Sequence, residues 1–288
     1  MKIYYYAYTG HKYGLDRARR ATVILKKLNE KGFNTMLLVN DFRAGLAMRD
    51  FGILESINIE GIQDIDAIAQ TGDVVIIDSP EDDHGRLVKY CSDFKQVFRF
   101  AEYDDDKSIH GEIMLTVDCK KDEECISSII VDDIYFETHE KIDRTLFFLG
   151  DSDSDKILLK NSNFFIKNPM ELLLGNYFYV KYEDDLKKIF TTLYEPEEYI
   201  QLICSSKRVI TASLQTAIEA SVAGAEVFYL SKEAISYKNK ELLKLFNIIL
   251  IISLDEYTNK QLTIDNVLTN SNYVEKSETV VNKIINLI

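Results

Sequence analysis

A histidine lies between two glycines directly after the first apolar run of the chain. Residues 9–14 (Thr-Gly-His-Lys-Tyr-Gly) follow the run at residues 2–7 and precede an amphipathic stretch. Gly10 and Gly14 permit a tight turn, and a helix after such a turn offers unpaired N–H groups and a positive dipole end to an anion. Histidine is the side chain that most readily exchanges protons near neutral pH. The pattern fits chemistry at His11 on a phosphorylated substrate, and equally a plain strand-to-helix turn with a surface histidine.

A second pattern with chemical potential lies in the C-terminal half. Residues 208–224 have the pattern of a strand, a turn with hydroxyl side chains, a helix and a terminating glycine. Ser213 is a good N-cap, and Ser213 with Thr216 can hold phosphate oxygens at the helix N-terminus. Glu219 follows nearly two turns later, close to one helical face, where a carboxylate can accept hydrogen bonds from ribose hydroxyls. The alternative is an ordinary capped helix with a solvent-facing glutamate.

Three aspartates are further candidates. Asp78 ends an apolar run, where it can orient His11 or bind a sugar hydroxyl, but an exposed strand-end aspartate is at least as likely to cap the next helix. Asp151 and Asp153 follow a later apolar run, and turn formation is a simple alternative role for both.

The elements that must position these residues alternate along the chain. In the N-terminal half, strands are expected at residues 2–7, 34–39, 73–78 and 96–101, and helices at residues 15–32, 43–51 and 83–94. Residues 104–140 carry charge clusters and are expected to be mainly solvated loops. Further strands are expected at residues 144–150, 176–181, 208–211, 226–230 and 248–252, and helices at residues 196–204, 213–223, 238–245 and 274–288.

This alternation predicts an α/β protein with two Rossmann-like domains, each built on a parallel sheet. We expect the domains to be residues 1–140 and 141–288. Because open sheets place ligands at the carboxyl ends of their strands, His11 and Ser213 are expected on opposing walls of a cleft between the domains.

Composition narrows the possible partners and compartments. A formal charge of −13 argues against nucleic acid as a partner. The four cysteines form no CxxC pair or metal-ligand spacing with the histidines, so no structural zinc is expected, and they are predicted to be free buried thiols in a reducing cytoplasm. The N-terminus has the pattern of a strand start rather than a signal peptide, and no apolar run approaches a membrane span. The sequence therefore predicts a soluble cytoplasmic protein.

Taken together, the Gly-His turn and the Ser/Thr turn with its helical glutamate resemble the GT-B nucleotide-sugar superfamily, which includes the peptidoglycan N-acetylglucosamine transferase. Within it, the chain most resembles the nucleotide-sugar hydrolases of the pseudaminic acid pathway and the related spore-coat polysaccharide group. Residues 75–79, 147–153 and 198–224 carry the rest of the likeness. The family's first turn usually has Gly-x-Gly-His, with an Arg three residues after the histidine. Here Tyr8 replaces the first of these glycines and Gly14 stands at the position of the Arg. Arg17, Arg19 or Arg20 could compensate.

The resemblance implies a reaction and a set of site residues. His11 would activate water for attack on the anomeric carbon of a UDP-linked (deoxy)amino sugar, with Asp78 as a second catalytic residue. UDP would lie against the C-terminal domain, with Ser213 and Thr216 near the phosphates and Glu219 at the ribose. The implied substrate-binding residues are Gly10, Tyr13, Gly14, Arg17, Gly150, Ser152, Ser213, Thr216 and Glu219. No metal and no cofactor is expected, because the UDP-sugar is itself the substrate.

The same residues leave two alternatives open. In a glycosyltransferase, His11 would deprotonate an acceptor hydroxyl instead of water. In a nucleotide-sugar-binding protein without catalysis, the fold would be kept and the altered glycine pattern would reflect lost activity. The resemblance places the hydrolase in surface-glycan or flagellin-type glycosylation, with possible association with other enzymes of the glycan pathway.

Overall fold

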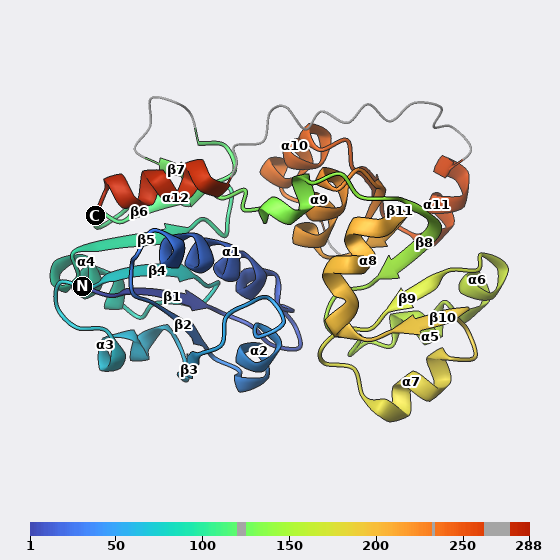
Figure 1. The fold of residues 1–288 in the computed structure, drawn as a ribbon, viewed down its shortest axis with the longest axis horizontal. Helices are drawn as coiled ribbons and strands as arrows, with labels where there is room; N and C mark the ends of the chain where they lie inside the picture. The colour runs from blue at the N-terminus through green and yellow to red at the C-terminus, as the bar shows by residue number, and fades with distance from the viewer. Residues whose placement is uncertain (120–124, 232–233, 262–276) are drawn as a thin grey trace. The chain divides into compact units, whose positions relative to one another are not determined.

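The computed structural model describes residues 1–119, 125–231, 234–261 and 277–288. The chain divides into two compact units, the first formed by Met1–Val131 with Val274–Ile288 and the second by Asp132–Tyr273. Each unit contains one parallel sheet with helices packed against it (Figure 1). The predicted α/β class with two Rossmann-like domains is confirmed.

The sheet of the first unit has seven parallel strands in the order β3-β2-β1-β4-β5-β6-β7. The strands are β1 (Ile3–Ala7), β2 (Thr35–Val39), β3 (Ser56–Asn58), β4 (Val74–Asp78), β5 (Gln96–Phe100), β6 (Ile113–Thr116) and β7 (Cys125–Ser127). The chain builds outward from β1 to β3 and then returns to place β4 on the other side of β1. The order therefore reverses between β1 and β4, the point at which open α/β sheets bind ligands.

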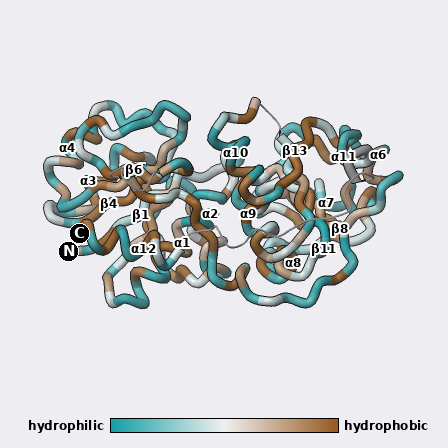
Figure 2. The backbone as a smooth tube through the Cα atoms, turned by 90° about the horizontal axis from the view of Figure 1, so that it is seen from above, coloured by the Kyte–Doolittle hydropathy of each residue, from teal (hydrophilic) through white to brown (hydrophobic). Residues whose placement is uncertain are grey.

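Helices cover both faces of this sheet, as the burial of both faces of β1 requires. They are α1 (Asp16–Glu30), α2 (Phe42–Ala47), α3 (Ile65–Ile68) after the 3₁₀ turn η1 (Ile62–Asp64), α4 (Arg86–Asp93) and α12 (Ser277–Asn286). Tyr4 and Tyr6 pack in a cluster with residues of α3 and α4, whereas α1 and α12 lie against the opposite face (Figure 1). Hydrophobic residues, drawn in brown in Figure 2, lie along the strands.

The last helix corrects the predicted division of the chain. α12 was expected to belong to a domain of residues 141–288, but it packs on α1 and β7 of the first unit. Lys31 Nζ lies 2.6 Å from Glu278 Oε1, and Ser277 Oγ lies 2.6 Å from the carbonyl oxygen and 3.0 Å from the amide nitrogen of Val131. The first unit's leading segment also ends at residue 131 rather than 140. Chain order alone did not reveal this return of the C-terminus.

The sheet of the second unit has six parallel strands in the order β10-β9-β8-β11-β12-β13. They are β8 (Ile142–Phe148), β9 (Glu171–Leu173), β10 (Thr192–Tyr194), β11 (Ser206–Thr211), β12 (Glu226–Leu230) and β13 (Ile249–Ile251). The order reverses between β8 and β11, so this unit has its own switch point.

The core of the second unit is rich in phenylalanine, with Phe147, Phe165, Phe190 and Phe228 in one buried cluster. Its helical elements are η2 (Asp133–Phe136), α5 (Ile157–Lys160), α6 (Ser162–Lys167), α7 (Val180–Leu186), η3 (Pro196–Glu198), α8 (Tyr199–Ser205), α9 (Leu214–Val222), α10 (Tyr237–Leu245) and α11 (Leu254–Gln261). Within the described ranges, no helix combines the length and apolar character needed to cross a membrane.

One predicted strand is wrong. Residues 176–181 form a turn and the start of α7, because the amide of Phe178 bonds the carbonyl of Gly175 at 3.0 Å and closes a turn there. Tyr177 is buried, which explains the strand-like composition of this segment. The strand of this region is the earlier β9.

The cysteines also differ from expectation. Cys119 and Cys125 form a disulfide, so the prediction of four free thiols is wrong. Cys91 and Cys204 are free, and burial raises the pKa of each thiol to about 11. Cys119 and Cys125 are six residues apart, and this spacing does not distinguish a disulfide from two free thiols.

These thiols should react slowly. A pKa near 11 leaves mainly the unreactive neutral thiol at pH 8, so we expect Cys91 and Cys204 to be alkylated roughly 100-fold more slowly than an ordinary cysteine, with rates that rise toward pH 11. Mass spectrometry after iodoacetamide treatment measures this. Unfolding without reductant should expose two alkylation sites, and unfolding with reductant four. Four sites without reductant would contradict the disulfide.

Candidate functional site

Two turns meet at the carboxyl edge of the sheet in the second unit. β8 pairs with β11, with Phe148 opposite Thr211, and the amide of Ala212 donates to the carbonyl of Phe148 at 3.3 Å. The turn with Gly150 and Ser152 follows β8, and Ser213 follows β11. These segments come from distant parts of the sequence, and the fold brings them together at the switch point.

Ser213 caps α9 as predicted. Its Oγ accepts a hydrogen bond from the amide of Thr216 at 3.0 Å, and the hydroxyls of Ser213 and Thr216 lie 2.7 Å apart. Thr211 Oγ1 in turn accepts from the amide of Ser213 at 3.0 Å. Ser213 is 7% exposed and Thr216 is fully buried, so the threonine hydroxyl points into the protein in this state.

Glu219 is buried, in contrast to the alternative of a solvent-facing glutamate. It is 2% exposed, and its carboxylate accepts hydrogen bonds from the Tyr199 hydroxyl and the Gln215 amide, both at 2.7 Å. Tyr199 also lies 2.7 Å from Thr216 Oγ1. Sequence reasoning missed Tyr199 and Gln215, because neither stands in a pattern that distinguishes a buried partner from a helix residue.

The hydroxyl protons in this network follow one direction. A carboxylate only accepts, so Tyr199 donates its single proton to Glu219. Thr216 must then donate to Tyr199, and Ser213 to Thr216. The negative charge of Glu219 thereby orients each hydroxyl from the N-terminus of α9 inward.

The Gly150 turn is held by close backbone contacts. Gly150 has φ +116°, a conformation that favours glycine. The Asp151 backbone lies against Gly175, where an added Cβ would come within 2.4 Å of it, and the Asp151 carbonyl accepts from the amide of Tyr177 at 2.9 Å. Ser152 is half-buried beside it.

Asp153 forms a turn, which is the alternative to a role in the site that the sequence offers for it. Its carboxylate accepts from the amides of Ile157 at 2.7 Å and Leu158 at 3.0 Å, at the start of α5, and bonds the Tyr182 hydroxyl. Burial, together with that bond, raises the pKa of Tyr182 above its usual value.

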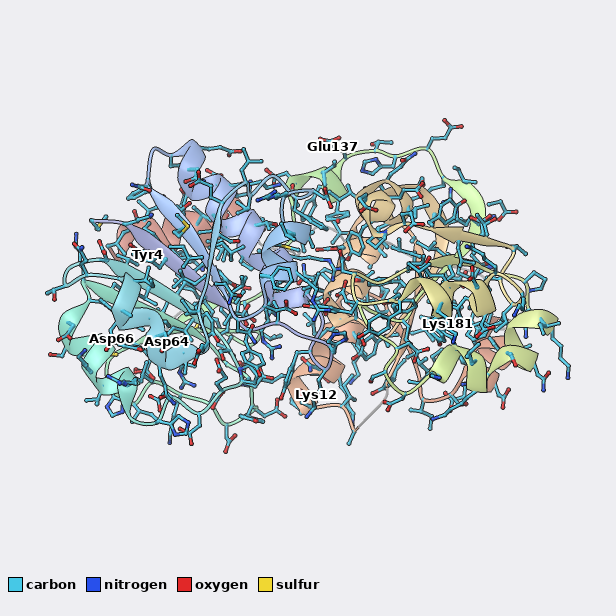
Figure 3. The ribbon with its side chains drawn as sticks, turned by 90° about the horizontal axis from the view of Figure 1, so that it is seen from below. Tyr4, Lys12, Asp64, Asp66, Glu137 and Lys181 are labelled. Atoms are coloured by element: carbon cyan, nitrogen blue, oxygen red, sulfur yellow. A yellow bond between two sulfur atoms is a disulfide. The ribbon has the colours of Figure 1, made fainter. Side chains whose placement is uncertain are left out.

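In the first unit, the Gly-His turn follows β1 at the switch point. Gly10 has φ +141° and Gly14 φ +69°, and the amide of Gly14 donates to the Gly10 carbonyl at 2.8 Å. Both glycines are therefore required by the tight turn that precedes α1. Lys12, labelled in Figure 3, is exposed in this turn.

Tyr13 is packed among charged and aromatic groups. Its ring meets that of Tyr8 edge-on with centroids 5.1 Å apart, and the cations of Lys12 and Arg17 lie 5.2 and 5.6 Å from its centroid. It remains 38% exposed. The turn therefore presents an aromatic surface beside positive charge.

Asp78 lies at the centre of a buried ion-pair network. It is 1% exposed, and its carboxylate accepts from the Tyr5 hydroxyl at 2.9 Å and from Arg20 Nη2 at 2.9 Å. Arg17 Nε lies 3.4 Å away, and the other end of Arg17 binds both oxygens of Glu102. Burial and the charge of Asp78 raise the pKa of Tyr5 well above its usual value. The expected exposed aspartate is thus a buried one that anchors α1.

His11 has a different partner. Arg43 Nη2 lies 3.1 Å from His11 Nε2. Asn40 joins the same two loops, because its side chain accepts from the amide of Thr9 at 2.7 Å and donates to the Thr9 carbonyl at 3.0 Å. Sequence reasoning missed Asn40 and Arg43, which lie about 30 positions from the histidine.

In the part of the chain that the structure describes, no group of three or more His, Cys, Asp or Glu side chains is placed to hold a metal ion.

Comparisons with known proteins give a clear result only for structure. No protein-family model matches the chain, and no curated protein matches it. Solved structures do match over nearly its whole length. The S. aureus MnaA–UDP co-structure has a TM-score of 0.65 at 13% identity, covering 100% of this chain and 97% of that one.

Two further neighbours have the same architecture. The Methanocaldococcus jannaschii UDP-GlcNAc 2-epimerase in complex with UDP-GlcNAc and UDP gives a TM-score of 0.64 at 11% identity, covering 100% and 99% of the two chains. A Rickettsia africae glycosyltransferase gives 0.53 at 12%, covering 99% and 93%. At these identities the likeness shows the fold alone.

Proposed function

We propose that the protein is an enzyme that acts on a UDP-sugar and releases UDP by hydrolysis. The observation that carries this proposal is the Ser213 turn with α9 at the switch point of the second unit, where Ser213, Thr216 and Glu219 form one hydrogen-bonded network. Two solved neighbours, one in complex with UDP-GlcNAc and UDP and the other with UDP, support the nucleotide.

In this proposal each group has a defined task. The diphosphate lies at the N-terminus of α9, where the helix dipole stabilises the charge that develops on the leaving group. Ribose hydroxyls replace the Gln215 amide as donors to Glu219. His11 accepts a proton from the attacking water at the anomeric carbon, with no metal ion required. The placement of His11 and Ser213 across a cleft stays a prediction.

A (deoxy)amino sugar is the substrate that the resemblance to the pseudaminic acid and spore-coat groups favours. Glycosyl transfer is the second candidate, because solved glycosyltransferases share this fold. His11 would then take the proton of an acceptor hydroxyl. Because several neighbours are UDP-GlcNAc 2-epimerases, the assay must also separate inversion at C2 from hydrolysis.

Product analysis on a panel of UDP-sugars tests the proposal. We expect free UDP and free sugar without any acceptor, detected by chromatography and mass spectrometry. UDP that forms only with an acceptor supports transfer, and a 2-epimeric UDP-sugar supports epimerisation. UDP binding without turnover on every donor and acceptor would replace the enzyme with a non-catalytic binding protein.

A further inference from the structure

Arg43 fixes the proton on His11. An arginine side chain has donors and no acceptor, so Arg43 Nη2 donates to His11 Nε2 across the 3.1 Å between them. A neutral imidazole carries one proton, which must then lie on Nδ1. The contact therefore selects one neutral tautomer of His11.

Arg43 is itself held in place. Asp41 Oδ2 accepts from Arg43 Nη2 at 3.2 Å, and Asp41 Oδ1 accepts from Nε at 3.3 Å and from the Arg43 amide at 3.0 Å. This carboxylate points the guanidinium toward His11. The Arg43 side chain is nevertheless 41% exposed, so an anion in solution can reach it.

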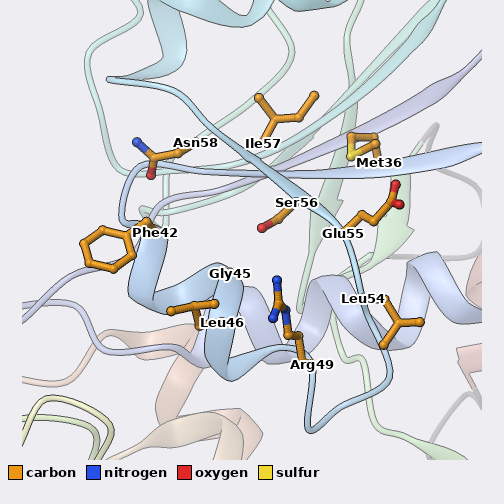
Figure 4. A pocket seen from close by; sticks show the side chains of 10 residues that line it. All are labelled: Met36, Phe42, Gly45, Leu46, Arg49, Leu54, Glu55, Ser56, Ile57 and Asn58. Atoms are coloured by element: carbon orange, nitrogen blue, oxygen red, sulfur yellow. The ribbon is translucent and has the colours of Figure 1, made fainter.

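The loop after β1, which carries His11, and the loop after β2, which leads to Arg43, are held together by hydrogen bonds. Three hydrogen bonds link Asn40 to Thr9. The helix that carries Arg43, α2, packs closely on β3 (Figure 4). An added Cβ on Gly45 would lie 2.2 Å from Ser56 Oγ. A pocket of about 420 Å³ lies on this side of α2 and is lined in part by Arg49, whose side chain is exposed.

The arrangement is incompatible with base catalysis through Nε2 while the contact lasts, because that nitrogen has one lone pair and Arg43 uses it. We propose that Arg43 is a positioning residue that holds neutral His11 at rest and releases Nε2 when the diphosphate of the substrate takes over the guanidinium. The planar fork of arginine suits bidentate binding of phosphate. This inference rests on the proposed function, in which His11 is the base.

The resting contact can be tested without turnover. In the full chain labelled with ¹⁵N-histidine, NMR should show His11 protonated at Nδ1 and unprotonated at Nε2, with the signals assigned by their loss in His11→Asn. Arg43→Met should abolish this fixed pattern and give a mixture of tautomers. Arg43→Lys should restore it in part, and the matched Arg49→Met should leave it unchanged. A wild-type spectrum with Nε2 protonated would overturn the resting contact.

Release is tested by adding saturating UDP. We expect the wild-type Nε2 signal to move away from its arginine-bonded position, and Arg43→Met to raise KM for the UDP-sugar by roughly 10- to 150-fold, the loss of one charge-assisted hydrogen bond. An unchanged Nε2 signal at saturation, or an unchanged KM, would overturn the release step. The ligand-free spectra do not depend on activity. An inactive protein would therefore refute the proposed function, and the ligand-free spectra would still decide whether the resting contact between Arg43 and His11 exists.

Discussion

Replacing His11 with asparagine should lower turnover of the UDP-sugar by roughly 10²–10⁴-fold, the range for loss of general base catalysis. UDP affinity should stay the same, because His11 itself makes no proposed contact with the nucleotide. The asparagine carbonyl can still accept from Arg43, so the local fold should persist. Steady-state kinetics and calorimetry with UDP measure the two quantities separately.

The matched control is His84→Asn. His84 is exposed and has φ +48°, a conformation that asparagine tolerates well. It should leave both turnover and affinity unchanged. A folded His11→Asn variant that turns over UDP-sugar as fast as the wild type would remove His11 from the mechanism.

Replacing Glu219 with alanine should have two effects. UDP affinity should fall by about 1–3 kcal/mol, because the ribose loses a charged acceptor. The ligand-free protein should also melt at a lower temperature, because the buried Tyr199 hydroxyl and Gln215 amide lose their acceptor at a cost of about 1–3 kcal/mol. The sequence alone predicts almost no change in melting temperature, since it cannot show that Glu219 is buried.

Two variants separate the effects. Glu219→Gln keeps an acceptor for Tyr199 and removes the charge, so it should lose less stability than the alanine variant and still bind UDP more weakly. Glu197→Ala, at an exposed position in the preceding η3 turn, should change neither quantity. Calorimetry that finds wild-type UDP affinity in folded Glu219→Ala would reduce the residue to a structural role.

The sequence predicts the main strands and both turns because these features are local. Apolar runs bounded by glycine, serine or aspartate identify β1, β4, β8 and β11 with the residues that follow them. The short strands β3, β6 and β7 give no such signal, since each has three or four residues.

The partners of the site residues could not be predicted in the same way. Arg43 reaches His11 from another loop, and Tyr199 reaches Glu219 from another helix, so each contact depends on tertiary packing. Asp78 was expected at the surface because a strand end usually is exposed. Arg17 and Arg20, one helical turn apart on α1, cover it instead.

The most direct test of the proposed UDP-sugar site is a crystal structure of the protein with UDP. We expect the diphosphate at the N-terminus of α9 beside Ser213, ribose hydroxyls within hydrogen-bonding distance of the Glu219 carboxylate, and the β-phosphate directed toward His11. UDP bound away from α9, or His11 facing outward where it cannot share a ligand with Ser213, would contradict the account.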